Sequence, residues 1–236
     1  MKYIIYFKIY QKLYIFISKY FLNSKTFSYS DSVSALVNGV DGVALSSPIL
    51  EDGAILLNDS KQVSIRLCGV EQSYLKLISV DSVTYRGVFN IGTPDVPYLV
   101  VGAATAAQLE TSVHFVSPVT VFTPIHDAKI NLANPDGAFN QIELFVAGVY
   151  SVHQQDTDSR FAFLPISTAR ALFGQDSLCC TPIDIKTSKD IEKTKELLVS
   201  KLSELTTDLQ FKVETKTELH AEFYKMLKVE KWITFL

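Results

Sequence analysis

The densest group of polar side chains in this sequence is His153-Gln-Gln-Asp156-Thr-Asp158-Ser-Arg160. Two carboxylates at this spacing can chelate a cation or act as a general acid and base, so Asp156 and Asp158 form the candidate catalytic pair. The segment lacks the glycine and the distant glutamate of a calcium-binding loop. The sequence therefore favours a solvated loop that enters a strand over a catalytic or metal site.

Other arrangements that carry out catalysis are absent from the sequence. It contains no G-x-x-x-x-G-K-[ST], no G-x-G-x-x-G, no G-x-S-x-G and no H-E-x-x-H. The 4 histidines stand far apart in the chain, which does not suit a metal site. We therefore expect no catalytic residues, no cofactor, no metal and no enzymatic activity.

Three cysteines, Cys68, Cys179 and Cys180, give an odd number with one adjacent pair. Neither a disulfide framework nor a zinc-ligand spacing has this pattern. We expect them to pack as small buried apolar residues, with a single bridge from Cys68 as the alternative.

Length and charge limit the remaining classes of protein. The chain has 236 residues, of which 47% are hydrophobic and 20% charged, so it is long enough for one large or two small globular domains. Residues 1–30 hold five of the 22 basic residues and no acidic one, which leaves 17 basic and 25 acidic residues, a charge of −8, in the rest. Such a body lacks the basic face of a nucleic-acid-binding protein.

The first thirty residues are basic and aromatic, and lysines interrupt every apolar run. The longest runs are about five residues, whereas a membrane-spanning helix needs about 20. The segment also lacks the small-residue cleavage site of a secretory signal. We expect residues 1–30 to form a membrane-proximal segment that lies at a membrane surface.

From residue 31 onward the hydrophobic pattern indicates alternating strands and helices. Asp31 or Ser32 is expected to cap a short first helix, Ser167 a helix at 168–173 that ends at Gly174, and an acidic turn is expected at 51–53. Strands are predicted at 43–50, 54–57, 62–70, 98–102, 116–122, 142–150, 160–164, 182–186 and 211–214. A helical step follows at 103–109, and the strong turn signal Asn134-Pro-Asp-Gly137 predicts a long hairpin between 116–122 and 142–150.

The last third of the chain carries two capping-box patterns. Thr187 with Asp190 precedes a charge-rich helix with a stripe of leucines up to Leu205, and Thr215 with Glu218 precedes a helix that continues to the end of the chain. Phe223, Met226, Leu227 and Trp232 lie along this last helix. The aromatic Trp232 beside Lys231 is typical of the start of a membrane span, so we expect a truncated boundary at the membrane.

These elements predict an α+β fold with two lobes. Residues 31–80 and 181–236 would form a mixed α/β lobe near the membrane, and residues 81–180 an inserted β-rich lobe.

The ordered pieces resemble the extracytoplasmic domain of FtsX-like ABC-transporter permeases of the macrolide-exporter and lipoprotein-releasing types, with the closer likeness to the lipoprotein-releasing (Lol-type) members. The matching segments, in order, are Val37-Asn-Gly-Val40; Ile65-Arg-Leu-Cys-Gly-Val-Glu71 with Tyr74; Val100-Val-Gly102 with Ala106 and Leu109; Phe145-Val-Ala-Gly-Val-Tyr150; Phe163-Leu-Pro165 with Ala169 and Leu172; and Phe223-Tyr-Lys-Met-Leu-Lys-Val-Glu-Lys-Trp232. The resemblance covers residues 31–236, and it implies that the chain is a fragment of such a permease.

The resemblance implies a function in transport. The domain would face the periplasm at the bacterial inner membrane and couple ATP hydrolysis by a cytoplasmic ATPase to release of lipoproteins to a periplasmic carrier, in a complex with a second permease copy. The carrier would bind the hairpin tip at 123–139, with Ile125, Ile130, Leu132 and Phe139 as apolar anchors, and the C-terminal helix would act as the lever. Two alternatives stay open: a macrolide-exporter-type efflux domain that docks to an adaptor and an outer-membrane channel, and a stand-alone hydrolase that uses Asp156 and Asp158.

Overall fold

The structure is a computed structural model that describes residues 14–19, 27–78, 80–113, 117–125, 138–175, 179–187, 190–205, 211–215 and 218. The chain divides into two compact units, one of residues 1–47 with 182–236 and the other of residues 48–181. The sequence placed the first boundary after residue 80, but in the structure it lies after Ser47. The reason is that residues 48–70 pair with strands of the second unit.

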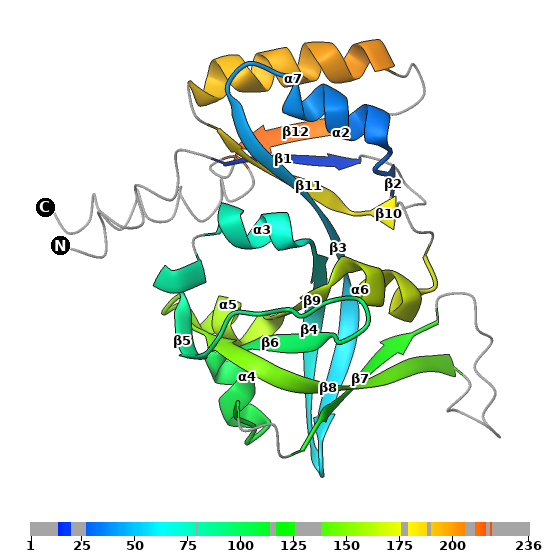
Figure 1. The fold of residues 1–236 in the computed structure, drawn as a ribbon, viewed down its shortest axis with the longest axis vertical. Coiled ribbons are helices and arrows are strands. Elements are labelled where there is room, and N and C mark those ends of the chain that lie inside the picture. The colour runs from blue at the N-terminus through cyan, green and yellow to red at the C-terminus, as the bar shows by residue number, and fades with distance from the viewer. Residues whose placement is uncertain are drawn as a thin grey trace, which may run out of the picture. The chain divides into compact units, whose positions relative to one another are not determined.

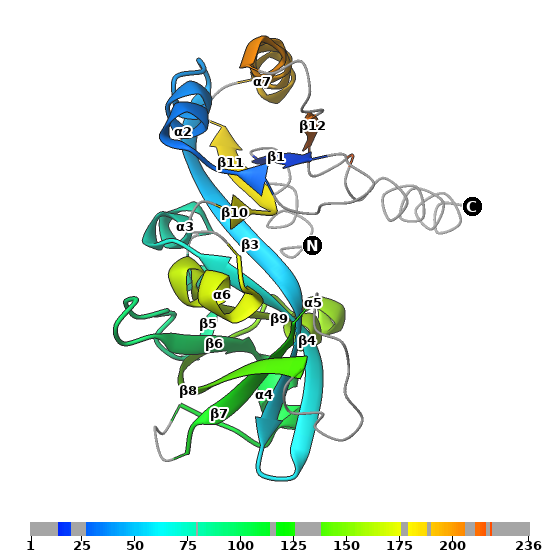
Figure 2. The ribbon, with the colours of Figure 1, turned by 90° about the vertical axis from the view of Figure 1, so that its right-hand side faces the viewer.

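The first unit combines a small antiparallel sheet with two helices. Its sheet has the order β12 (Phe211–Thr215), β1 (Tyr14–Lys19) and β11 (Pro182–Thr187), and β11 is followed by β3 (Val43–Asn58). The helices α2 (Asp31–Asn38) and α7 (Ile191–Leu205) lie on the same side of it (Figures 1 and 2). Sequence patterning did not indicate β1, which falls inside the segment that we expected at a membrane surface, and β2 (Phe27–Ser28) follows it.

Helix α7 packs on β12 and β1 through one stripe of side chains. Thr194, Leu198 and Leu202, which are four residues apart, are buried, in agreement with the predicted amphipathic pattern. The helix begins after Asp190, whose Oδ1 accepts a hydrogen bond of 3.0 Å from the backbone N–H of Glu192. The predicted cap at Thr187 is therefore wrong, because Thr187 is the last residue of β11.

The second unit is built on a ring of six strands. These are β3 (Val43–Asn58), which begins in the first unit, β4 (Lys61–Val70), β9 (Phe161–Pro165), β6 (Tyr98–Gly102), β8 (Phe139–Tyr150) and β7 (Val119–Pro124). Each strand pairs with the next, and β7 pairs with both β8 and β3, so the ring closes (Figure 2). Closure into a barrel leaves few strand edges that could pair with other chains.

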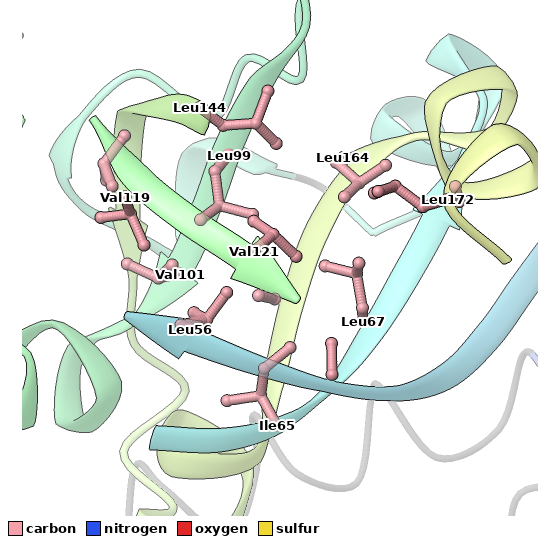
Figure 3. Close-up of a cluster of buried hydrophobic side chains, with 14 of the residues drawn as sticks. Leu56, Ile65, Leu67, Leu99, Val101, Val119, Val121, Leu144, Leu164 and Leu172 are labelled. Atoms are coloured by element: carbon pink, nitrogen blue, oxygen red, sulfur yellow. The ribbon is translucent and has the colours of Figure 1, made fainter. Parts of the chain in front are cut away.

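The barrel interior is filled by one apolar side chain from every second position of its strands. Leu56, Val121, Leu99 and Leu164 are fully buried members of one cluster, in which Leu99 lies beside Val121 and Leu164 beside Leu172 (Figure 3). Helices α4 (Ala103–Gln108) and α6 (Ile166–Phe173) add Ala106 and Leu172 to the same core. Burial of so many aliphatic side chains is the main source of stability of this unit.

A second apolar cluster lies on the outer side of the barrel. It combines residues of α3 (Gln72–Leu77) with Phe89, Tyr150 and Phe163, whose rings are 5.5–6.2 Å apart, as in tilted or edge-to-face aromatic pairs. The short elements η1 (Val80–Ser82), β5 (Thr84–Gly87) and β10 (Cys179–Cys180) complete the unit.

Two local predictions fail for identifiable reasons. The expected acidic turn at 51–53 is the middle of the continuous strand β3, where Glu51, Asp52 and Gly53 face Cys68, Leu67 and Arg66 of β4. Helix α6 begins at Ile166 directly after Pro165, so Ser167 lies inside the helix and does not cap it. Its predicted end is confirmed, since Gly174 has the left-handed φ of 63° that glycine tolerates best.

Candidate functional site

The candidate catalytic pair, Asp156 and Asp158, is not a pair in the structure. Both residues lie on the short helix α5 (Gln155–Arg160), where Asp156 is exposed and Asp158 is buried. Asp158 Oδ2 accepts a hydrogen bond of 2.7 Å from the Ser151 hydroxyl, and its Oδ1 accepts one of 2.8 Å from the Val152 backbone N–H. The carboxylate thus fixes the turn between β8 and α5. The expected solvated loop is instead a short helix with Asp158 buried.

Two neighbouring groups hold the same turn in place. The Tyr150 hydroxyl lies 3.0 Å from the carbonyl oxygens of Thr157 and Phe161, and burial raises the pKa of this phenol well above its usual range. A Cβ on Gly102 would overlap the carbonyl of Asp158, so α5 lies directly against the end of β6. These contacts are those of a tightly packed structural corner.

The cysteines and other potential ligands form no metal site among the described residues. Cys68 and Cys180 are buried and Cys179 is half-buried, and none of the three forms a disulfide, so the alternative of a bridge from Cys68 is wrong. Burial raises the pKa of the Cys180 thiol, which makes it a poor nucleophile. Within the described part of the chain, no three His, Cys, Asp or Glu side chains come close enough to hold a metal ion.

The predicted hairpin is present as the antiparallel pair β7–β8, with Val119 opposite Leu144 and Pro124 opposite Phe139. The end of the pair next to the connecting loop is held by the C-terminal end of α6, because the Thr123 hydroxyl and the Asn140 amide both donate to the carbonyl of Leu172, at 2.9 and 2.8 Å. Just beyond the strands the Ile125 N–H donates to the Ala138 carbonyl. The antiparallel pairing therefore extends to Ile125 and Ala138.

Of the four predicted anchors, two can be located. Phe139 is 41% exposed and Ile125 is half-buried, whereas Ile130 and Leu132 lie outside the described residues.

Phe145 is a further exposed aromatic residue, 38% accessible, which sequence reasoning did not single out. It lies on the same face of β8 as Phe139 because residues an even number apart point to one side of a strand, with Glu143 between them. The sequence signal for this exposed face was the set of alternate strand positions occupied by Phe139, Gln141, Glu143 and Phe145.

The second capping box is confirmed by its hydrogen bonds. The Glu218 carboxylate accepts from the Thr215 N–H at 2.8 Å, and the Glu218 N–H donates to the Thr215 hydroxyl at 3.3 Å. Both carboxylate oxygens also lie 2.6 Å from Lys195 Nζ on α7. The Lys195 ammonium, together with the Thr215 N–H, lowers the pKa of Glu218.

The lever residues Phe223, Met226, Leu227 and Trp232 lie outside the described residues, as does the helix they were placed on. No helix in the described ranges is both long and apolar enough to cross a bilayer.

Comparison with known proteins gives structural matches only. No family model matches the sequence, and no curated protein matches it. The periplasmic region of MacB from Actinobacillus actinomycetemcomitans is similar in structure, with a TM-score of 0.60 and 17% identity over 89% of this chain and 92% of that one. The extracellular domain of the noncanonic ABC-type transporter YknZ from Gram-positive bacteria has a TM-score of 0.57 and 15% identity, over 85% of this chain and 99% of its own.

A domain of a putative permease from Porphyromonas gingivalis is also similar, with a TM-score of 0.50 and 13% identity over 87% of this chain and 91% of that one. At these identities the matches show the fold alone. The chain therefore has the mixed α/β fold of a MacB-like periplasmic domain. The other two neighbours are an extracellular domain of an ABC-type transporter and a domain of a putative permease.

Proposed function

We propose that this chain is the extracytoplasmic domain of an ABC-transporter permease, anchored in the bacterial inner membrane and facing the periplasm. The observation that supports the proposal is the extent of the structural match, which spans 89% of this chain and 92% of the MacB periplasmic region. We propose that the domain itself is not catalytic, and the use of the Asp158 carboxylate to hold a turn supports this. A cytoplasmic ATPase would supply the energy, and a second permease copy would complete the complex.

Within this function we propose lipoprotein release to a periplasmic carrier as the task. The support for it is the resemblance of the sequence segments together with the hairpin β7–β8, which exposes Phe139 next to residues that are hydrogen-bonded to Leu172. Apolar anchors on an exposed hairpin are suited to hold a soluble partner.

Carrier binding can be tested at the hairpin. We expect replacement of both Ile130 and Leu132 by Asp to abolish retention of the carrier on the immobilised 236-residue chain. Leu197→Asp is the matched control, because this exposed leucine lies on α7 in the other unit. Undiminished carrier binding by the double variant contradicts the assignment of the hairpin.

A macrolide-exporter-type role is the second candidate, and the match to MacB supports it. In that case the same domain would dock to a periplasmic adaptor and an outer-membrane channel. Co-purification separates the two: a soluble lipoprotein carrier supports lipoprotein release, and an adaptor with a channel supports efflux.

The lever role of the C-terminal helix is likewise a proposal. A continuous helix carries displacement without absorbing it in loops, so two glycines inserted near Ala221 should uncouple ATP hydrolysis from release in the complete complex. Unchanged coupling in that variant is evidence against a lever.

A further inference from the structure

Two adjacent residues of α7, Thr194 and Lys195, contact two different segments of the first unit. The Lys195 ammonium binds both carboxylate oxygens of Glu218, at 2.6 Å each. Thr194 is buried and lies so close to Gly42 that a Cβ on this glycine would overlap the threonine hydroxyl. One turn of a single helix therefore lies against both the residue that caps the C-terminal segment and the turn that precedes β3.

The contact at Gly42 is tightly packed. Gly42 has a φ of +97°, which L side chains rarely adopt, and Val43, the first residue of β3, donates its N–H to the Val40 carbonyl across the same turn. The Thr194 hydroxyl is oriented by its own hydrogen bond of 2.8 Å to the Asp190 carbonyl. A shift of α7 at this point must move the turn, because close-packed groups leave no free volume to absorb it.

The contact at Glu218 is equally specific. The same carboxylate that binds Lys195 also accepts from the Thr215 N–H, at 2.8 Å, and from its hydroxyl, at 3.1 Å. The Lys195 side chain is 21% exposed, whereas both partners of the Lys201–Glu204 pair on the same helix are more than half exposed. Salt and solvent therefore screen the Lys195–Glu218 pair less than the Lys201–Glu204 pair.

We propose that Thr194 and Lys195 form a relay that couples the position of Glu218 to the turn at residues 40–43 and so to the beginning of β3. A displacement would enter at Glu218, because this residue caps the start of the C-terminal segment. It would reach Gly42, the residue before β3, and β3 continues along the chain into residues of the second unit. The use of the relay in transport rests on the proposed function. The existence of the relay is independent of that function and can be tested in the isolated chain.

The test is amide hydrogen exchange of Val40 and Val43 in the 236-residue chain. Both N–H groups are hydrogen-bonded within the segment that contacts Thr194. Glu218→Gln keeps a capping side chain but removes the charge that Lys195 binds. We expect exchange at both amides to become at least about twofold faster, the lower end of measured couplings between contacting residues. Lys195→Met should give the same result.

Two controls separate a relay from general weakening. Lys201→Met removes the exposed pair on the same helix and should leave Val40 and Val43 unchanged. Exchange at the buried Leu198 reports loss of global stability, so an equal acceleration there overturns the proposal.

A double variant tests whether Thr194 is part of the relay. In a Thr194→Ala background, Glu218→Gln should no longer change exchange at Val40 and Val43, and a persisting effect also overturns the proposal. If the relay exists but the protein has no role in transport, Glu218→Gln will accelerate exchange at Val40 and Val43 as predicted, but no ATPase partner will be found.

Discussion

Substitution of Asp158 measures how much the buried carboxylate contributes to folding. Asp158 is 5% exposed and accepts two hydrogen bonds, from the Ser151 hydroxyl at 2.7 Å and the Val152 N–H at 2.8 Å. Hydrogen bonds to a charged group contribute about 1.5–3 kcal/mol each, so loss of both in Asp158→Ala should lower the free energy of unfolding by about 3–6 kcal/mol. Asp158→Asn keeps one acceptor for Val152, and we expect a loss of about 1–2 kcal/mol.

The assay is urea unfolding followed by circular dichroism, which gives the free energy of unfolding of each variant. Asp156→Ala is the matched control on the same helix, and since Asp156 is exposed we expect a change within about 0.5 kcal/mol. Equal losses for Asp156 and Asp158 would refute the reasoning. A substrate whose turnover stops with Asp158→Asn in a fully stable protein would restore the hydrolase alternative.

Three further predictions concern packing and pH. Leu164→Ala in the barrel centre should cost about 2–5 kcal/mol in urea unfolding, and the exposed Leu197→Ala much less. Glu218 has a lowered pKa in the folded state, so its stabilisation is present above about pH 4.5 and is lost as the pH falls through the folded value; the stability gap between wild type and Glu218→Gln should therefore narrow at pH 3. Burial raises the pKa of Glu51 in the folded state despite its ion pair with Arg66. The free energy of unfolding should therefore decline as the pH rises through this raised pKa, and Glu51→Gln should be at least as stable as wild type at pH 7.

Local signals predicted most individual elements of the fold. The leucine stripe of α7, the strand at β6 followed by α4, and the glycine stop at Gly174 all depend on near neighbours in sequence. Closure of the barrel could not be predicted in this way. It depends on the pairing of β7 with β3, where Val121 lies opposite Leu56. This contact is long-range, and the local sequence of neither strand indicates its partner.

The candidate site shows the same limit. The capping box of Thr215 and Glu218 is a three-residue pattern and was predicted, but its link to Lys195 joins residues 23 positions apart and was not. Asp158 was misread because its local sequence is as polar as any loop. Its burial is imposed by Gly102, which lies more than fifty residues earlier and lets α5 approach the end of β6.

The second unit offers a partner two different exposed strand surfaces. β5 is the last strand of its sheet, yet it has only four residues, is irregular between Thr84 and Arg86, and carries the Arg86 guanidinium 5.5 Å from the centre of the Tyr85 ring. Short, bulged and charged edges resist strand addition. The outer face of β8 instead presents Phe139 and Phe145 on a hairpin whose loop end is hydrogen-bonded to α6. Binding through side chains of β8 therefore suits this domain better than strand addition to β5, because rigid exposed aromatic residues supply contact area at a low cost in conformational entropy.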